Sequence, residues 1–169
     1  MKPLDSIEIK LCQKQAKIFE ASVYKAECSS PIFIRRFMNS SIAKLMDEKL
    51  YLCTFGTDDD AFLNLDEEFG KSGYGKEKYG RDQMFWIGYI YRCLSIKYNL
   101  SSKSIYKLFN AKNIVKYYNI CHTFDIVDAA ERMMDSISYD NSSIQEKAYN
   151  IMKRLMCEEK ANKFISKNY

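Results

Sequence analysis

The segment from residue 82 to residue 98 most strongly limits what this chain can fold into. It reads DQMFWIGYIYRCLSIKY and contains the only tryptophan of the chain, Trp86. A helix through this segment would carry apolar side chains on nearly every face, a pattern typical of a helix that is buried on all sides. We therefore expect this segment to form the central helix of the fold.

Two residues within this segment carry further predictions. Gly88 lowers helix propensity by about 1 kcal/mol relative to alanine, so its presence predicts the close approach of a second helix. Arg92 follows one turn later and lies on the same helix face as Gly88. A buried arginine requires a carboxylate or carbonyl partner, and we expect such a group to meet Arg92.

Few residues that break helices occur in the chain as a whole. Its 169 residues include two prolines and six glycines, while 47% of them are apolar. This balance favours helices over strands and turns, and the length is sufficient for a substantial core. We predict an all-α fold, a compact single-domain multi-helix bundle over residues 1–169, with a long helix at 140–169 that is a candidate to project from it.

Cap residues predict where individual helices begin. Serine, threonine, aspartate and asparagine accept hydrogen bonds from the first backbone N–H groups of a helix, and proline fits the first turn. Residues 50–55, LYLCTF, instead favour a strand or an extended connection. The predicted helix starts are Asp5, Ser29 to Pro31, Ser40 or Ser41, Thr57 or Asp58, Asp82, Ser101 or Ser102, Thr123 or Asp125, and residues 140–143.

Two stretches near the middle of the chain have the composition of ligand-binding loops without their spacing. Residues 57–69 hold six acidic residues and no basic one, but Phe62 and Leu63 stand where a calcium loop needs a ligand and a glycine. Residues 70–81 hold four of the six glycines without a phosphate-loop pattern. We predict a flexible connection rich in glycine, tyrosine and lysine at 70–81, and no cofactor.

The single histidine, His122, is the obvious catalytic candidate. A histidine base needs an orienting carboxylate, and Asp125 lies three residues later, with Arg132 on the next predicted helix. A lone histidine at a helix entry is more often a hydrogen-bonded structural residue. With one histidine and six cysteines that show no C-x-x-C spacing, we predict no metal site.

A basic stretch follows the central segment and offers a candidate nucleic-acid face. It contains five lysines and no acidic residue within twenty positions, and tyrosines are interleaved with the lysines. Lysine contacts phosphates and tyrosine stacks on bases, although a solvated lysine face over a tyrosine-lined core gives the same pattern. The candidate residues are Lys97, Lys103, Lys107, Lys112, Lys116 and Tyr117, with Tyr106 nearby.

The sequence also predicts a location. Its first residues, MKPLDSIEIKLC, have no apolar run of signal-peptide length, and no stretch approaches the roughly 20 apolar residues of a membrane span. We expect a cytoplasmic protein with reduced thiols and no membrane contact. Homo-oligomer formation is left open.

Three motifs resemble those of a small uncharacterised family of Gram-positive bacterial proteins associated with toxin–antitoxin cassettes. They are WIGYIYR at 86–92, SSKSIYK at 101–107 and the ending HTFDIVDAAER at 122–132. Such proteins are encoded beside short antitoxin-like helical proteins and toxins similar to ADP-ribosyltransferases. The resemblance implies these partner-binding residues: Trp86, Tyr89, Arg92, Ser102, Lys103, Tyr106, His122, Thr123, Asp125 and Arg132.

These observations favour a non-enzymatic intracellular module that binds a partner protein, as an antitoxin or an accessory of such a cassette. The alternative is a regulator that binds nucleic acid through the lysines between residues 97 and 118. A third hypothesis is an enzyme centred on His122, Asp125 and Arg132. We assign no catalytic residue from the sequence.

Overall fold

The computed structural model describes residues 3–54 and 57–137. Every regular element within these residues is a helix and none is a strand, which confirms the predicted all-α class. The chain divides into two units, residues 1–130 and 131–169. The predicted helix at 140–169 lies outside the described residues. The helices are α1 (Ser6–Lys25), α2 (Ser30–Met38), α3 (Ser41–Asp47), α4 (Tyr51–Thr54), α5 (Asp59–Phe69), α6 (Arg81–Tyr98), α7 (Ser102–Leu108), α8 (Ala111–Cys121) and residues 126–137.

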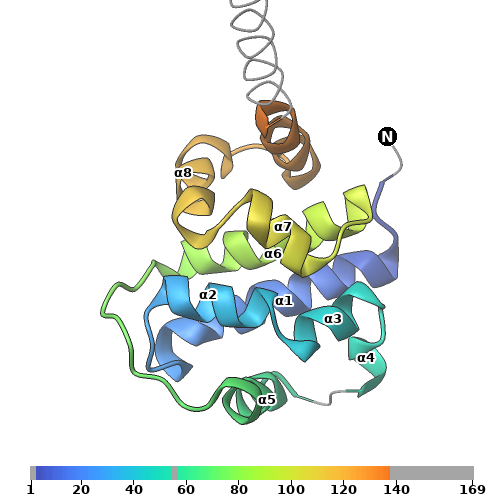
Figure 1. Ribbon diagram of the computed structural model, residues 1–169. Coiled ribbons are helices and arrows are strands. Elements are labelled where there is room, and N and C mark those ends of the chain that lie inside the picture. The colour runs from blue at the N-terminus through green and yellow to red at the C-terminus, as the bar shows by residue number, and fades with distance from the viewer. Residues whose placement is uncertain (1–2, 55–56, 138–169) are drawn as a thin grey trace, which may run out of the picture. The chain divides into compact units, whose positions relative to one another are not determined.

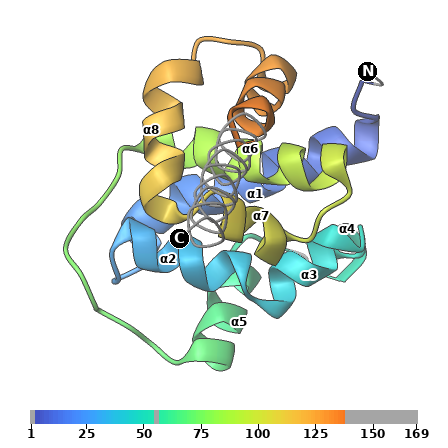
Figure 2. The same ribbon diagram turned by 45° about the horizontal axis from the view of Figure 1, so that its top comes forward.

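The helices α1 and α6 form the centre of the first unit. They make the most extensive contact between any two of the labelled helices, and both views show them side by side (Figures 1 and 2). Arg81 at the start of α6 binds Glu20 in the last turns of α1, whereas Arg92, three turns later in α6, binds Gln15, which comes earlier in α1. The two helices therefore run antiparallel.

Gly88 allows this close contact, as its place in the sequence predicted. A Cβ atom added at Gly88 would lie 2.8 Å from the Ala16 Cα atom and 2.8 Å from the Gln15 carbonyl oxygen. Both of these are backbone atoms, so no side chain can rotate away to make room. The helix–helix distance at this point is therefore set by the absence of a side chain.

A cluster of aromatic rings fills the space beside the α1–α6 pair. The Phe19 ring of α1 packs edge-on against Phe37 of α2 at 4.9 Å and against Phe33 at 5.4 Å. The buried Tyr91 hydroxyl of α6 donates a 2.5 Å hydrogen bond to the Phe109 carbonyl after α7, because a buried hydroxyl needs a partner. Tyr91 of the central segment is thus part of the buried scaffold.

Several predicted helix starts are confirmed by capping bonds. The Asp5, Ser40 and Ser101 side chains each accept a backbone N–H from the helix that follows. Two predictions are wrong. Residues 51–54 form the short helix α4 rather than a strand. α6 begins two residues earlier than expected, with Gly80 rather than Asp82 at the cap, because the Gln83 side chain reaches back to the Gly80 N–H.

The acidic helix α5 and the residue before it make ion pairs and hydrogen bonds to α1, α2 and α3. Lys14 pairs with Asp58 at 2.6 Å, Lys25 pairs with Asp59, and Glu68 accepts bonds from the backbone and hydroxyl of Ser41. Four of the six acids, Asp58, Asp59, Asp66 and Glu68, therefore meet cations or helix-start donors supplied by α1, α2 and α3. Gly70 ends the helix with a φ of 74°, as predicted.

The connection at 70–80 is irregular, as the sequence predicted, and runs from α5 to α6 past the start of α2 (Figure 1). Two backbone bonds attach it there, from Ser29 N to the Tyr74 carbonyl and from Ser30 N to the Glu77 carbonyl. The Ser30 hydroxyl also accepts the Tyr79 N–H at 2.9 Å. The start of α2 thus obtains part of its capping from this connection.

We predict that Gly88→Ala destabilises the protein although alanine favours helices. The gain in helix propensity is about 1 kcal/mol, but overpacking against the α1 backbone costs about 1–3 kcal/mol or more, so the free energy of unfolding should fall. Gly73→Ala is the matched control, since nothing lies within 4 Å of an added Cβ there. Denaturant unfolding measures both, and a stabilised Gly88→Ala protein would contradict the packing described.

Candidate functional site

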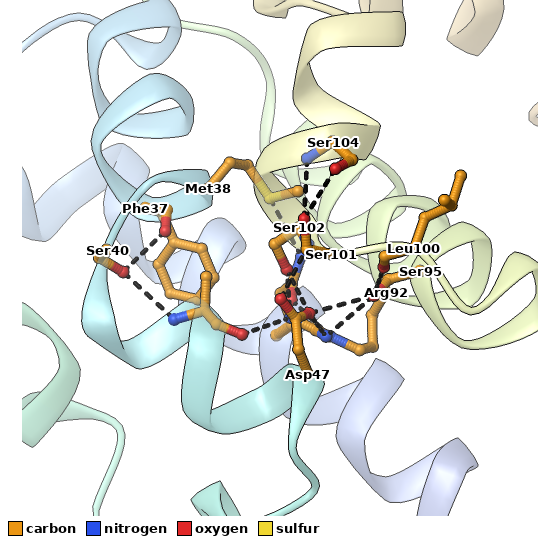
Figure 3. Close-up of polar contacts among 12 residues, drawn as sticks. Phe37, Met38, Ser40, Asp47, Arg92, Ser95, Leu100, Ser101, Ser102 and Ser104 are labelled. Carbon is orange, nitrogen blue, oxygen red and sulfur yellow. Dashed lines mark hydrogen bonds and ion pairs between the residues drawn. The ribbon is translucent and has the colours of Figure 1, made fainter.

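A buried arginine organises the polar interior of the first unit. The Arg92 side chain is fully buried and reaches from α6 toward Asp47 and Ser102 (Figure 3). Its Nη1 donates to the Asp47 carboxylate at 2.5 Å, its Nη2 to the Ser102 hydroxyl at 2.9 Å, and its Nε to the Gln15 side-chain oxygen at 2.9 Å. The predicted need for a carboxylate partner is confirmed, and Asp47 supplies it.

Asp47, the last residue of α3, is the second centre of this cluster. Its carboxylate also accepts the Ser102 backbone N–H at 2.8 Å and the Ser102 hydroxyl at 2.7 Å, and the Ser95 hydroxyl donates to it at 3.1 Å. Burial lowers the pKa of the Arg92 guanidinium, and the Asp47 charge opposes that shift. One ion pair therefore joins α3, α6 and α7, while Gln15 adds α1.

A polar hollow of about 440 Å³ borders this cluster where α3 and α7 begin. Its serines and lysines suggest an anion site, but the backbone donors at both helix starts are already occupied. Ser41 N binds the Glu68 carboxylate at 2.9 Å, and Ser102 N binds Asp47. The chain's own carboxylates thus take the place that an anion would need, and the cluster is structural.

A second hollow, of about 190 Å³, lies on α6 and the turn that follows α8. We call it the aromatic hollow, and its lining residues are Phe85, Trp86, Tyr89, Phe124 and Ile126. Phe85 is 36% exposed and Phe124 is 41% exposed, whereas Trp86 is 9% exposed. The Trp86 Nε1–H has no hydrogen-bond partner within the described residues. These large apolar side chains stay accessible beside a fully buried core.

His122, Thr123 and Asp125 lie in the exposed turn beside this hollow. The His122 ring stacks on Tyr118 at 4.8 Å, and Tyr118 in turn meets Trp86 edge-on at 5.6 Å. His122 Nδ1 is 2.9 Å from the Tyr118 carbonyl, whereas the Asp125 carboxylate accepts the Val127 N–H at 2.8 Å. Asp125 is therefore a helix cap, and it does not orient the imidazole.

The sequence-predicted cluster is thus divided among separate places. The hydrogen bonds of Arg92 go to α1, α3 and α7, and none goes to His122 or Asp125. Arg132 belongs to the second unit. Cys121 is buried while the adjacent His122 is exposed. The described residues contain no group of three or more His, Cys, Asp or Glu side chains able to hold a metal ion.

Four lysines form the lysine face, which we define as Lys103 and Lys107 on α7 with Lys112 and Lys116 on α8. All four are exposed, and none has a carboxylate partner among the described residues. The other candidates differ, because Lys97 donates to the Val127 carbonyl at 3.4 Å. The half-buried Tyr106 lies on α7, and the half-buried Tyr117 ring packs edge-on against Phe109 at 5.3 Å.

Buried thiols add no reactive group to these surfaces. Burial raises the pKa of the Cys12 thiol to about 12 and that of Cys93 to about 11, so both remain protonated at neutral pH and pack as small apolar residues. Among the described helices, none is long and apolar enough to cross a bilayer.

The sequence did not identify Gln15 and Asp47, which complete the cluster around Arg92, or Phe124, which completes the aromatic hollow. Nothing in the local pattern marks Gln15 or Asp47, which lie 77 and 45 positions from Arg92. The charge of Arg92 predicted a carboxylate or carbonyl partner. It did not indicate which acidic residue on another helix would be that partner.

Comparison of the chain with family models, curated proteins and solved structures finds no match. The resemblance to the toxin–antitoxin-associated family therefore stays a prediction.

We predict that Asp47→Leu lowers the free energy of unfolding by about 3–5 kcal/mol, because it leaves a buried guanidinium without its counter-charge. Adding Arg92→Met to this variant should restore part of the loss, since no buried charge remains. Lys44→Ala on the same helix, whose Glu48 pair is exposed, should cost less than about 1 kcal/mol. Denaturant unfolding distinguishes these outcomes, and an Asp47→Leu protein of parental stability would refute the role of the ion pair.

Proposed function

We propose that this protein is a non-enzymatic module that binds a partner protein through the aromatic hollow. The observation that carries the proposal is the exposure of Phe85 and Phe124 around the nearly buried Trp86. Protein interfaces are enriched in aromatic residues, and a few such side chains supply most of the binding energy. A partner would remove this apolar surface from water.

The support beneath the hollow suits this role. Phe85, Trp86 and Tyr89 all come from α6, which is held to α1 by the contact at Gly88 and to α3 and α7 by Arg92. A rigid support lowers the entropy lost on binding, because the contact residues are already ordered. The Trp86–Tyr118–His122 ring series extends the support to α8.

The toxin–antitoxin context comes from the sequence resemblance. In that context the partner is a toxin encoded beside this protein, and the module acts as an antitoxin or as an accessory of the cassette. The enzyme hypothesis has less support, because His122, Asp125 and Arg92 make separate contacts and the single histidine bonds to a backbone carbonyl.

A second candidate function is nucleic-acid binding through the lysine face. A specific observation favours it. Residues 83–124 contain no acidic residue, and the four lysines of this face have no carboxylate partner among the described residues, whereas Lys14, Lys25 and Arg36 are paired with α5 or the residue before it. Unpaired lysines on two successive helices can contact phosphates without first breaking ion pairs.

We predict that Phe85→Ala and Phe124→Ala each weaken binding of the toxin encoded next to this protein by more than about tenfold, as expected for truncated hot spots. Leu63→Ala is the matched control, because Leu63 is 62% exposed on α5, away from the hollow. Calorimetric titration measures affinity, and growth rescue of cells that express the toxin measures function.

The absence of any complex with the parental protein would refute the proposal. Equal loss in all three variants would also count against it, since that result would indicate general unfolding and not a local contact. Circular dichroism of each variant checks that its helix content is unchanged.

For the alternative function we predict that Lys103→Glu with Lys107→Glu weakens binding to a labelled DNA duplex. The salt slope should fall by about one for each phosphate that the variant no longer neutralises. Lys10→Glu with Lys17→Glu is the control, because these α1 lysines are also exposed and the charge change is equal. Fluorescence anisotropy at several salt concentrations measures both. If the two pairs of substitutions weaken DNA binding equally, the attraction is non-specific and the lysine face has no particular role.

A further inference from the structure

Three aromatic rings of the first unit, two of them exposed and one half-buried, are covered in the same way. Three rings each lie under a basic side chain, at 5.5–5.7 Å from the ring centroid, and each basic side chain also pairs with a carboxylate. The three sets are Lys25 with Phe62 and Asp59, Arg36 with Phe69 and Asp66, and Arg81 with Tyr24 and Glu20.

Such sets combine two attractions for one cation. The face of an aromatic ring carries negative charge density that attracts ammonium and guanidinium groups, and the carboxylate adds an ion pair. A ring that lies at the surface is thereby partly removed from water.

The aromatic hollow has the rings and a nearby carboxylate of this arrangement, but no basic side chain among the described residues. The Phe85 and Tyr89 rings lie 6.4 Å apart at an angle of 38°, and no lysine or arginine covers either ring within the described residues. In the same part of the chain, the Asp125 carboxylate accepts a backbone N–H and pairs with no basic side chain among the described residues. Asp125 stands between Phe124 and Ile126, and both of these residues line the hollow. Burial raises the pKa of Tyr89, and the charge of Asp125 adds a smaller effect.

A second carboxylate lies on the same helix as the two rings. Asp82 is exposed one turn before Phe85, at a spacing that places the two side chains on the same face of α6. No basic side chain pairs with Asp82 among the described residues. Asp82 lies one turn before Phe85 and Asp125 lies next to Phe124, so two carboxylates stand near residues that line the hollow.

We infer that the aromatic hollow accepts an arginine or lysine side chain of the partner protein, with the rings of Phe85 and Tyr89 against the cation and Asp125 as its counter-charge. This inference rests on the proposed function and specifies the chemistry of the partner. The charge complementarity of the site excludes a glutamate or aspartate in the same position, because such a side chain would face Asp125 and Asp82.

Trp86 gives a direct signal for the test, because it lines the hollow and is the only tryptophan. The full chain is titrated with N-acetyl-arginine amide, and N-acetyl-citrulline amide serves as the neutral probe of the same shape. The arginine probe should change Trp86 fluorescence in a saturable way and bind at least about tenfold more tightly than the citrulline probe, the range expected for a cation over aromatic rings.

Two variants and a control complete the experiment. Phe85→Leu keeps an apolar side chain but removes the ring, and Asp125→Asn keeps a capping group but removes the charge, so each should weaken the arginine probe by about threefold or more. Glu67→Gln, an exposed charge on α5, should leave it unchanged.

Equal binding of the two probes would overturn the inference and indicate an apolar occupant. Absence of saturable binding by the arginine probe would overturn it as well. The proposed function would survive either result if Phe85→Ala still weakened the toxin complex, so the two claims fail separately.

Discussion

The ion pair between Arg92 and Asp47 is the interaction on which the rest of this structure depends. A guanidinium with no exposed surface has lost its hydration, and this loss is tolerated only when every donor finds an acceptor. The acceptors come from α1, α3 and α7, so the hydrogen bonds of one side chain join these three helices to α6. The close contact at Gly88 brings Gln15 within reach of Arg92 and belongs to the same constraint.

Much of the fold could be predicted because its signals are local. The capping roles of Asp5, Ser40 and Ser101 depend on residues within one turn, and the buried character of α6 depends on its own side chains. The errors concern the start of α6, where the Gln83 side chain caps at Gly80, and the segment after α3. The segment 51–54 has strand-like residues, yet it forms a helical turn within a chain of short helices.

The candidate site was predicted less well, for a physical reason. The sequence joined Arg92, His122, Asp125 and Arg132 because their motifs follow one another along the chain. Arg92 lies inside α6 and is satisfied by Asp47, whereas Asp125 lies at the surface and caps a helix. Proximity in sequence could not reveal this division, since it depends on which face of each helix turns inward. The hollow between Phe85 and Phe124 also required the fold, because its walls come from segments about 40 positions apart.

The first unit combines a scaffold with two candidate surfaces, and the central claim is that a partner protein covers the aromatic hollow. Hydrogen exchange of the full chain, measured with and without the proposed partner toxin, tests this claim most directly. We predict slower exchange in peptides that span residues 84–90 and 120–127, with unchanged exchange in α5. Protection confined to residues 103–117, or to α5, would contradict the claim.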